Sequence, residues 1–167
     1  MANVAVILLR QQFKNAHDWL DGTIGDIGYE HLHWQPNGLP SPIGAQYVHV
    51  VTVEDYFVSM LKGEQPLSET TFAGRTGSTE LPPEGPWNDW GERVRVNMEQ
   101  ARIYSAAVYE ATDAYIASLT DADIIEKLNE DGRTRASVFS TILLNTYSHA
   151  GEISALKGLQ GQPGYPV

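Results

Sequence analysis

The segment that decides the fold is Ser137-Val-Phe-Ser-Thr-Ile-Leu-Leu-Asn-Thr-Tyr-Ser-His-Ala-Gly-Glu-Ile-Ser-Ala-Leu-Lys157, near the end of the chain. Its apolar residues recur at helical spacing, in a stripe that includes Val138, Ile142, Ile153 and Leu156. Asn145 and His149 interrupt that stripe, one helical turn apart. A buried imidazole needs a hydrogen-bond partner or a metal, because an unsatisfied one is costly. The segment therefore predicts a core-facing helix that carries either a pair of ligands or a histidine bonded to a neighbouring tyrosine or carboxylate.

Three further segments show helical periodicity, over residues 3–21, 42–62 and 86–119. In the first, His17 flanks the apolar face, so it points inward or lies half-exposed at the surface. The third has a near-heptad inner face made of Trp90, Val94, Asn97, Ala101, Tyr104, Val108, Ala111 and Tyr115. No segment reads as a strand, so the chain is predicted to be all-α.

The second helix has a clear start and a polar interruption of its own. Ser41 is the predicted cap, with Pro42 at the first helical position. The apolar stripe consists of Ala45, His49, Val53, Tyr56 and Met60. His49 thus lies on an apolar face, as His149 does. Glu54 and Asp55 fall beside the stripe, which predicts a solvated edge for both carboxylates.

A long connection between the second and third helices sets the topology. Residues 63–86 are rich in proline and glycine and show no periodicity. At about 3.3 Å per residue, this connection exceeds the roughly 30 Å length of a 20-residue helix. The chain can therefore return to the starting end of the bundle, which makes the second and third helices parallel. The prediction is one domain over residues 1–167, a four-helix bundle with a long crossover connection.

Composition excludes several classes of function. The formal net charge of −10 repels phosphate backbones and anionic membranes, so we expect neither a nucleic-acid nor a membrane partner. The absence of cysteine rules out disulfides, thiolate metal sites and a cysteine nucleophile. No segment has the layout of a membrane span or signal peptide, and a cytoplasmic location is expected. An exposed helix face would allow a homodimer.

Facing helices of a bundle build sites from inward side chains, and His49, Asn145 and His149 are the residues placed to do so. Two neutral imidazoles, one oxygen ligand and open water positions suit Zn²⁺ or Ni²⁺. Such a metal lowers the pKa of bound water or activates a thiolate of a small-molecule substrate. The alternative is a polar core network of these residues with tyrosines such as Tyr56 and Tyr104.

The chain resembles the DinB/YfiT-like superfamily over nearly its whole length. The resemblance is carried by Leu32-His-Trp-Gln-Pro36, by Ser41-Pro-Ile-Gly-Ala-Gln-Tyr-Val-His-Val-Val-Thr-Val-Glu-Asp-Tyr56, and above all by Tyr147-Ser-His-Ala-Gly-Glu-Ile-Ser-Ala-Leu-Lys-Gly158. It implies a four-helix bundle with a crossover. It also implies a metal site of three histidines, matched here by His49 and His149, with Asn145 at the middle position.

The substitution at the middle position weakens the implied site. An amide oxygen is a poorer ligand than imidazole for a borderline metal, and Glu152 or His17 are the candidates to replace it. The resemblance implies thiol-dependent transferases or isomerases that use small bacterial thiols. The expected function is therefore a metal-dependent enzyme acting on a small molecule, with a degenerate His/Asn/His site and no assigned catalytic residue. The alternative is a non-enzymatic binding or structural bundle that has lost the metal.

Overall fold

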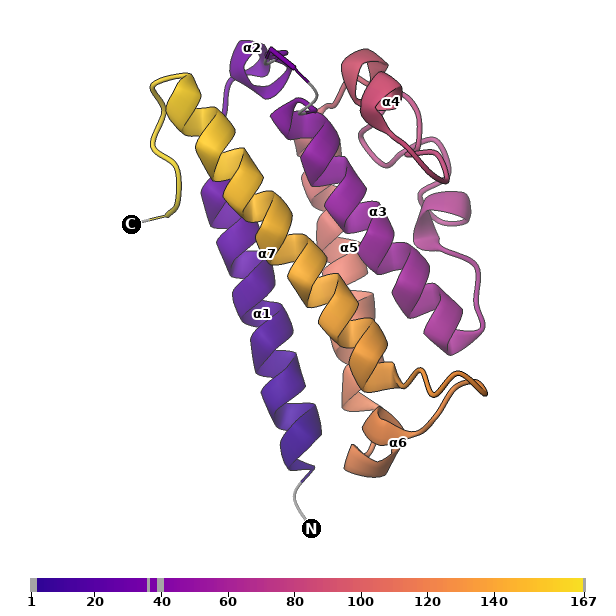
Figure 1. The fold of residues 1–167 in the computed structure, drawn as a ribbon. Coiled ribbons are helices and arrows are strands. Elements are labelled where there is room, and N and C mark those ends of the chain that lie inside the picture. Colours follow the sequence, from indigo (N-terminus) through magenta and orange to yellow (C-terminus); the bar gives the residue numbers. More distant parts are fainter. Residues whose placement is uncertain (1–2, 36, 39–40, 167) are drawn as a thin grey trace.

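Four long helices form the frame of the molecule: α1 (Val4–Ile24), α3 (Ile43–Lys62), α5 (Met98–Ala117) and α7 (Arg135–Leu159) (Figure 1). The computed structural model describes residues 3–35, 37–38 and 41–166, and within those ranges it contains no β-strand. The predicted all-α bundle is confirmed. Pro36 of the resembling motif, and residues 1, 2 and 167 of the predicted domain, lie outside the described residues. Within the same ranges, no helix is long and apolar enough to cross a membrane.

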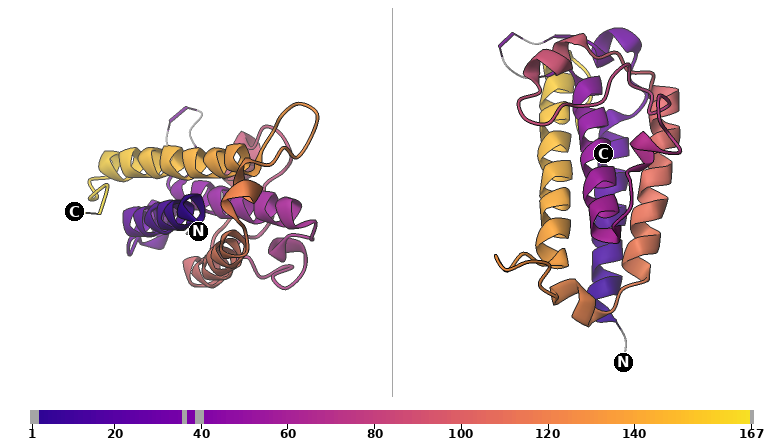
Figure 2. Two further views of the ribbon diagram at one scale, coloured as in Figure 1. Left: turned by 90° about the horizontal axis from the view of Figure 1, so that it is seen from below. Right: turned by 90° about the vertical axis from the view of Figure 1, so that its right-hand side faces the viewer.

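The helix directions agree with the predicted topology. In Figure 1, α1 and α7 run upward, whereas α3 and α5 both run downward. The connection from Lys62 back to α4 climbs the right-hand side of the bundle, and the side view of Figure 2 shows the same crossover. Each long helix packs on two others, α1 on α7 and α5, and α3 on α7 and α5. The crossover therefore makes α3 and α5 parallel neighbours.

Short helices also form: α2 (Tyr29–Leu32), η1 (Leu67–Glu69) and α6 (Asp121–Ile125) lie in connections outside the four predicted helices, whereas α4 (Asn88–Arg93) lies at the start of the third predicted helix. Thr120 begins α6 with a capping box, because its hydroxyl accepts from the Asp123 amide while the Asp123 carboxylate accepts from Thr120. A second capping box at Thr134 and Ser137 starts α7.

The third predicted helix is divided in two, which corrects the expectation of one helix over 86–119. Between α4 and α5 the chain is extended, and the Val96 amide donates to Nε2 of His33 at 2.9 Å. The Asn97 amide donates to the Gly77 carbonyl at 2.7 Å, and the Asn97 side chain then caps α5. Hydrogen bonds to two distant loops therefore replace the helical pattern at this point.

The face of α3 that enters the core also differs from the prediction. Tyr56 and Met60 are exposed, whereas Glu54 and Asp55 are only 1% and 3% exposed. Glu54 accepts from Thr112, and Asp55 accepts from Tyr104. The two apolar clusters of the core lie at opposite ends of the bundle, and these carboxylates belong to a polar layer between them.

The start of α3 lacks the predicted serine cap. Pro42 is the N-cap residue, and no side chain caps this helix. Ser41 is buried instead, and its carbonyl accepts from Nε2 of Gln46 at 2.9 Å. Its hydroxyl lies so close to Gly91 that a Cβ there would be 2.4 Å from Oγ. Ser41 therefore fixes α4 against the start of α3.

Candidate functional site

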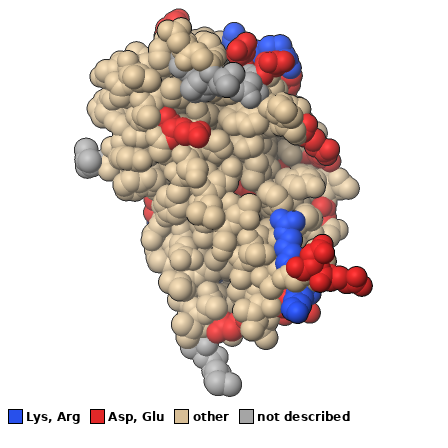
Figure 3. Space-filling model, viewed as in Figure 1, with Lys and Arg blue, Asp and Glu red and all other residues tan. Residues whose placement is uncertain are grey.

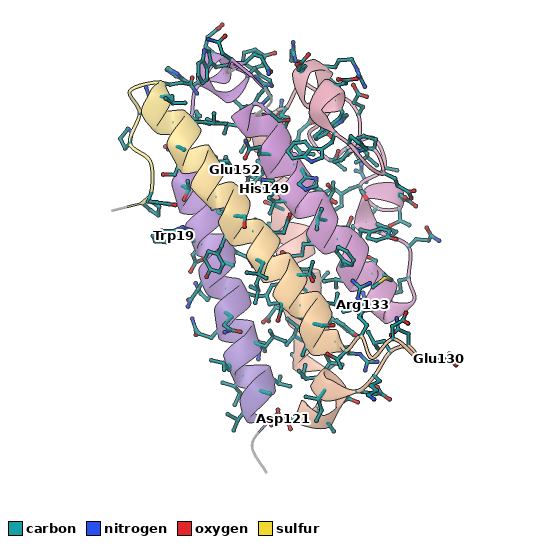
Figure 4. All side chains as sticks on the ribbon, in the orientation of Figure 1. Trp19, Asp121, Glu130, Arg133, His149 and Glu152 are labelled. Carbon is teal, nitrogen blue, oxygen red and sulfur yellow. The ribbon has the colours of Figure 1, made fainter. Side chains whose placement is uncertain are left out.

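Two imidazoles meet between α3 and α7. The ring centroids of His49 and His149 lie 5.0 Å apart, and the ring planes are nearly perpendicular at 84°. Figure 4 shows His149 on the side of α7 that faces α3. Both residues are half-buried. The structure thus brings together the two histidines that interrupt the apolar stripes in the sequence.

Trp87 covers this imidazole pair from the crossover connection. Its ring stacks on His49 with a centroid distance of 4.5 Å and an angle of 7°. It also meets the His149 ring edge-on at 5.7 Å. A ligand that approaches the pair from this side must displace or contact the indole. Trp87 therefore belongs to the site, although the sequence alone gave it no role.

Asn145 completes the group of three predicted residues. Burial is the largest cause that lowers the pKa of His49, to about 4, and the nearby His149 lowers it further. A hydrogen bond with the Asn145 side chain opposes this shift. Because a bond donated by the imidazole favours its protonated form, the amide oxygen of Asn145 is the acceptor. Nδ2 of Asn145 is then left buried, with no hydrogen-bond partner among the described residues.

Glu152 orients His149 rather than replacing the missing ligand. Its Oε2 lies 2.7 Å from Nδ1 of His149, and its side chain is largely exposed. A neutral His149 that donates from Nδ1 carries its lone pair on Nε2. Carboxylates commonly hold metal-binding histidines in this way.

His17, the other candidate replacement ligand, lies in the polar layer. Its Nε2 is 2.9 and 3.0 Å from the two carboxylate oxygens of Glu54, and its ring stacks on Tyr109 at 3.6 Å. The Thr112 hydroxyl donates to the same carboxylate at 2.6 Å. His17 is therefore engaged by Glu54, and in this arrangement it is no ligand for the His49 pocket.

A metal ion fits the site only in part. Two imidazoles bound through Nε2 to one tetrahedral ion have ring centroids roughly 5 Å apart, given metal–nitrogen distances of about 2.0–2.1 Å. The His49–His149 separation agrees with this value. The amide oxygen of Asn145 is already used by His49, and no group of three or more histidine or carboxylate side chains is placed to hold a metal within the described part of the chain. The two imidazoles can therefore supply two ligands to a metal ion, and water or a bound small molecule must supply the remaining ligands.

A cleft opens beside His49, between α3 and the crossover connection. Its volume is about 510 Å³. One wall comes from α3 and the other from η1 and residues 81–85; together they contain His49, Thr52, Val53, Tyr56, Phe57, Pro66, Ser68, Glu69, Leu81, Pro82, Pro83, Glu84 and Gly85. This volume lies in the range of small-molecule sites.

The polar network that was weighed as an alternative joined His49, Asn145 and His149 to tyrosines, but the structure places Tyr56 and Tyr104 in other surroundings. The Tyr104 hydroxyl donates to Asp55 at 2.7 Å, whereas Tyr56 is exposed and lines the cleft. The buried role of Glu54 and Asp55 was missed. A sequence signal did exist, because 54 and 55 lie between Val51 and Val58, which form a helical stripe of their own.

Comparison with known proteins adds a family and a fold. The model of the DinB superfamily matches residues 12–153. A crystal structure of a conserved protein from Enterococcus faecalis superposes with a TM-score of 0.78, covering 90% of this chain and 94% of that one, at 15% identity. At that identity the likeness shows the fold alone. No curated protein matches the chain.

Proposed function

Because this chain belongs to the DinB superfamily, we propose that it is an enzyme acting on a small molecule and that its imidazole pair is the core of a weakened metal site. His49 and His149 hold Zn²⁺ or Ni²⁺ in exchangeable form, and the substrate occupies the cleft beside His49. The reaction class is the thiol-dependent transfer or isomerisation that the family resemblance implies. The observation that carries the proposal is the 5.0 Å, nearly perpendicular arrangement of the two rings.

Each side chain of the site has a separate role in this proposal. The low pKa of His49 keeps it neutral at pH 7, so its ring presents no charge to a cation. Glu152 holds His149 in the tautomer whose lone pair is on Nε2. When bound, the metal supplies a Lewis acid that favours a thiolate over a thiol. Trp87 excludes water from one side of the pair.

A non-enzymatic polar network is the second candidate. The observations that favour it are the hydrogen bond between His49 and Asn145 and the stacking of Trp87 on His49, since both satisfy the imidazole without a metal. In that case the residues stabilise the junction of α3, α7 and the crossover. The cleft would then be a binding site with no metal chemistry.

Metal titration of the untagged protein decides between the two. Zn²⁺ and Ni²⁺ binding is measured by calorimetry in the wild type, in His149→Ala and in His31→Gln. His31 is the matched control, because it bonds to Gln160 and lies outside the pocket. We expect weak binding in the wild type and in His31→Gln, and none in His149→Ala. Equal binding by all three proteins would contradict the proposal.

The homodimer is proposed to use α7, which carries the exposed Leu144 (69%) and Tyr147 (44%). Figure 3, in the orientation of Figure 1, shows that the face crossed by α7 is largely uncharged. Two chains of net charge −10 can approach through such a face with few opposing carboxylates, among them Glu152 of α7. Light scattering should give the mass of a dimer for the wild type and of a monomer for Leu144→Glu. An unchanged mass in the variant would exclude this face.

A further inference from the structure

The cleft beside His49 is lined by negative charge, and this charge indicates the chemical class of its ligand, which the family membership leaves open. We propose that the cleft selects a small organic ammonium ion with an apolar body, recognised by two carboxylates and two aromatic rings. This inference rests on the proposed small-molecule function of the cleft. It concerns the substrate class, and it does not depend on whether the imidazole pair holds a metal.

Two carboxylates and no basic side chain line the cleft. Glu69 comes from η1 and Glu84 from residues 81–85 of the same wall, and both are exposed. Arg133 lies 5.5 Å from the ring centroid of Phe57, but it is not among the residues that line the cleft. The described lining therefore favours a cation and repels an anion.

The aromatic residues of the wall suit the same ligand. Tyr56 and Phe57 are neighbours on α3, and their rings meet edge to face at 5.4 Å. Tyr56 is 53% exposed, although its position in the sequence pattern predicts the core. An ammonium group over the face of such a ring is attracted by the negative potential of its π electrons. Leu81, Pro82 and Pro83 face the ligand with apolar surface.

The negative potential of the cleft would repel an anionic thiol. A thiol that carries carboxylates has to place them near Glu69 and Glu84, with no basic lining residue to compensate. An ammonium compound instead replaces solvent beside these carboxylates with an ion pair. The cleft thus narrows the substrates of the proposed enzyme to amines and other cationic molecules.

The test compares three probes of nearly equal size, benzylammonium, benzyl alcohol and benzoate. Their binding to the full chain is followed by NMR titration in the presence of EDTA, so that no metal contributes. We expect benzylammonium to bind ~tenfold more tightly than benzyl alcohol, equivalent to about 1.4 kcal/mol, and benzoate to bind most weakly. The double variant Glu69→Gln/Glu84→Gln should lose the preference.

A matched control removes the same charge elsewhere in this part of the chain. Glu64→Gln/Glu92→Gln changes two carboxylates outside the cleft lining and should keep the preference for benzylammonium. Equal binding of all three probes, tighter binding of benzoate, or no binding of any probe would overturn the inference. A failed metal titration with the ammonium preference intact would refute the metal site alone. Metal binding without charge preference would refute only the ligand class.

Discussion

The Tyr104 hydroxyl of α5 donates a 2.7 Å hydrogen bond to Oδ2 of Asp55 on α3. The same carboxylate accepts from the backbone amides of Leu67 and Ser68 at 2.9 and 2.8 Å. Asp55 thereby joins two parallel helices to the 3-10 helix of the crossover. Because this carboxylate is buried, the three donors depend on it for their hydrogen bonds.

Replacing Asp55 by alanine should destabilise the protein strongly. The change removes an acceptor from the Tyr104 hydroxyl and two backbone amides, so we expect a loss of about 3 kcal/mol in the free energy of unfolding. Urea denaturation measures this loss. Amide exchange should also become faster at Leu67 and Ser68. An exchange rate equal to that of the wild type there would show that η1 is held by other contacts.

Replacing Asn145 by histidine should restore metal binding. The new imidazole lies one turn before His149 on the same helix and supplies the third nitrogen ligand. At a metal concentration about 100 times Kd, binding adds about 2.7 kcal/mol, or roughly 5–10 °C in Tm for a chain of this size. Thermal unfolding with increasing Zn²⁺ or Ni²⁺ measures the effect.

The wild type should show only a small shift in the same titration. A variant that is destabilised and gives no metal response would mean that Asn145 belongs to a packed polar network, which the larger ring strains.

Stability should fall between pH 6.5 and pH 4. His49 has a folded-state pKa of about 4 against an ordinary value of 6.5, so the unfolded chain binds more protons within this window. The contribution of the neutral His49 side chain to the free energy of unfolding is complete above pH 6.5, and it is lost as the pH falls toward 4. The lowered pKa of His33 acts in the same direction. We expect a loss on the order of 2 kcal/mol from half-buried His49.

The difference between the wild type and His49→Gln isolates this contribution, because the other titrating groups are common to both proteins. Urea unfolding at a series of pH values gives the two profiles. Parallel profiles would show that His49 is not the titrating group.

The buried pair of His17 and Glu54 should matter far more than a surface pair. Their side chains are 11% and 1% exposed, so His17→Ala leaves a buried carboxylate with Thr112 as its remaining donor and should cost ~3 kcal/mol. Arg10 and Asp113 form the exposed comparison, and Arg10→Ala should leave the free energy of unfolding nearly unchanged. Chemical denaturation compares the two variants. Similar losses would argue that solvent reaches Glu54.

Gly77 should not tolerate a side chain. Its φ is +84°, and a Cβ would lie 2.4 Å from the amide nitrogen of Ala101, a backbone atom that cannot turn aside. Gly77→Ala should therefore cost more than ~2 kcal/mol. Gly85 also has a positive φ, but nothing lies within 4 Å of its Cβ position. Gly85→Ala thus measures the backbone strain alone, and equal losses in urea unfolding would rule out the clash.

The sequence predicted the long helices because their apolar periodicity is strong, and α7 includes the whole segment 137–157 on which the fold prediction rests. It failed at Val94 and Asn97, which continue the helical spacing of Trp90 and Ala101 although the chain is extended there. The helix is broken by hydrogen bonds from Val96 to His33 and from Asn97 to Gly77. Such long-range partners leave no mark in local periodicity.

The site could be predicted in part for the same reason. His49, Asn145 and His149 interrupt apolar stripes, and the structure brings them together. Trp87 lies in the irregular end of the crossover, so no periodic pattern places it on His49. Glu54 and Asp55 were assigned to solvent because charged residues are rarely buried without partners, and their partners lie on other helices.

The packing of α1 on α7 has a consequence for protein synthesis. The apolar side of α1, with Phe13 and Leu20 among its residues, is covered partly by a helix that begins only at Arg135. A ribosome adds about 5–20 residues per second, so synthesis reaches the start of α7 roughly 5–20 s after α1 has been synthesised. During that interval, its apolar stripe is available to other nascent chains and to chaperones. Completion of the bundle is therefore a late event, which follows release of the last helix from the ribosome exit tunnel.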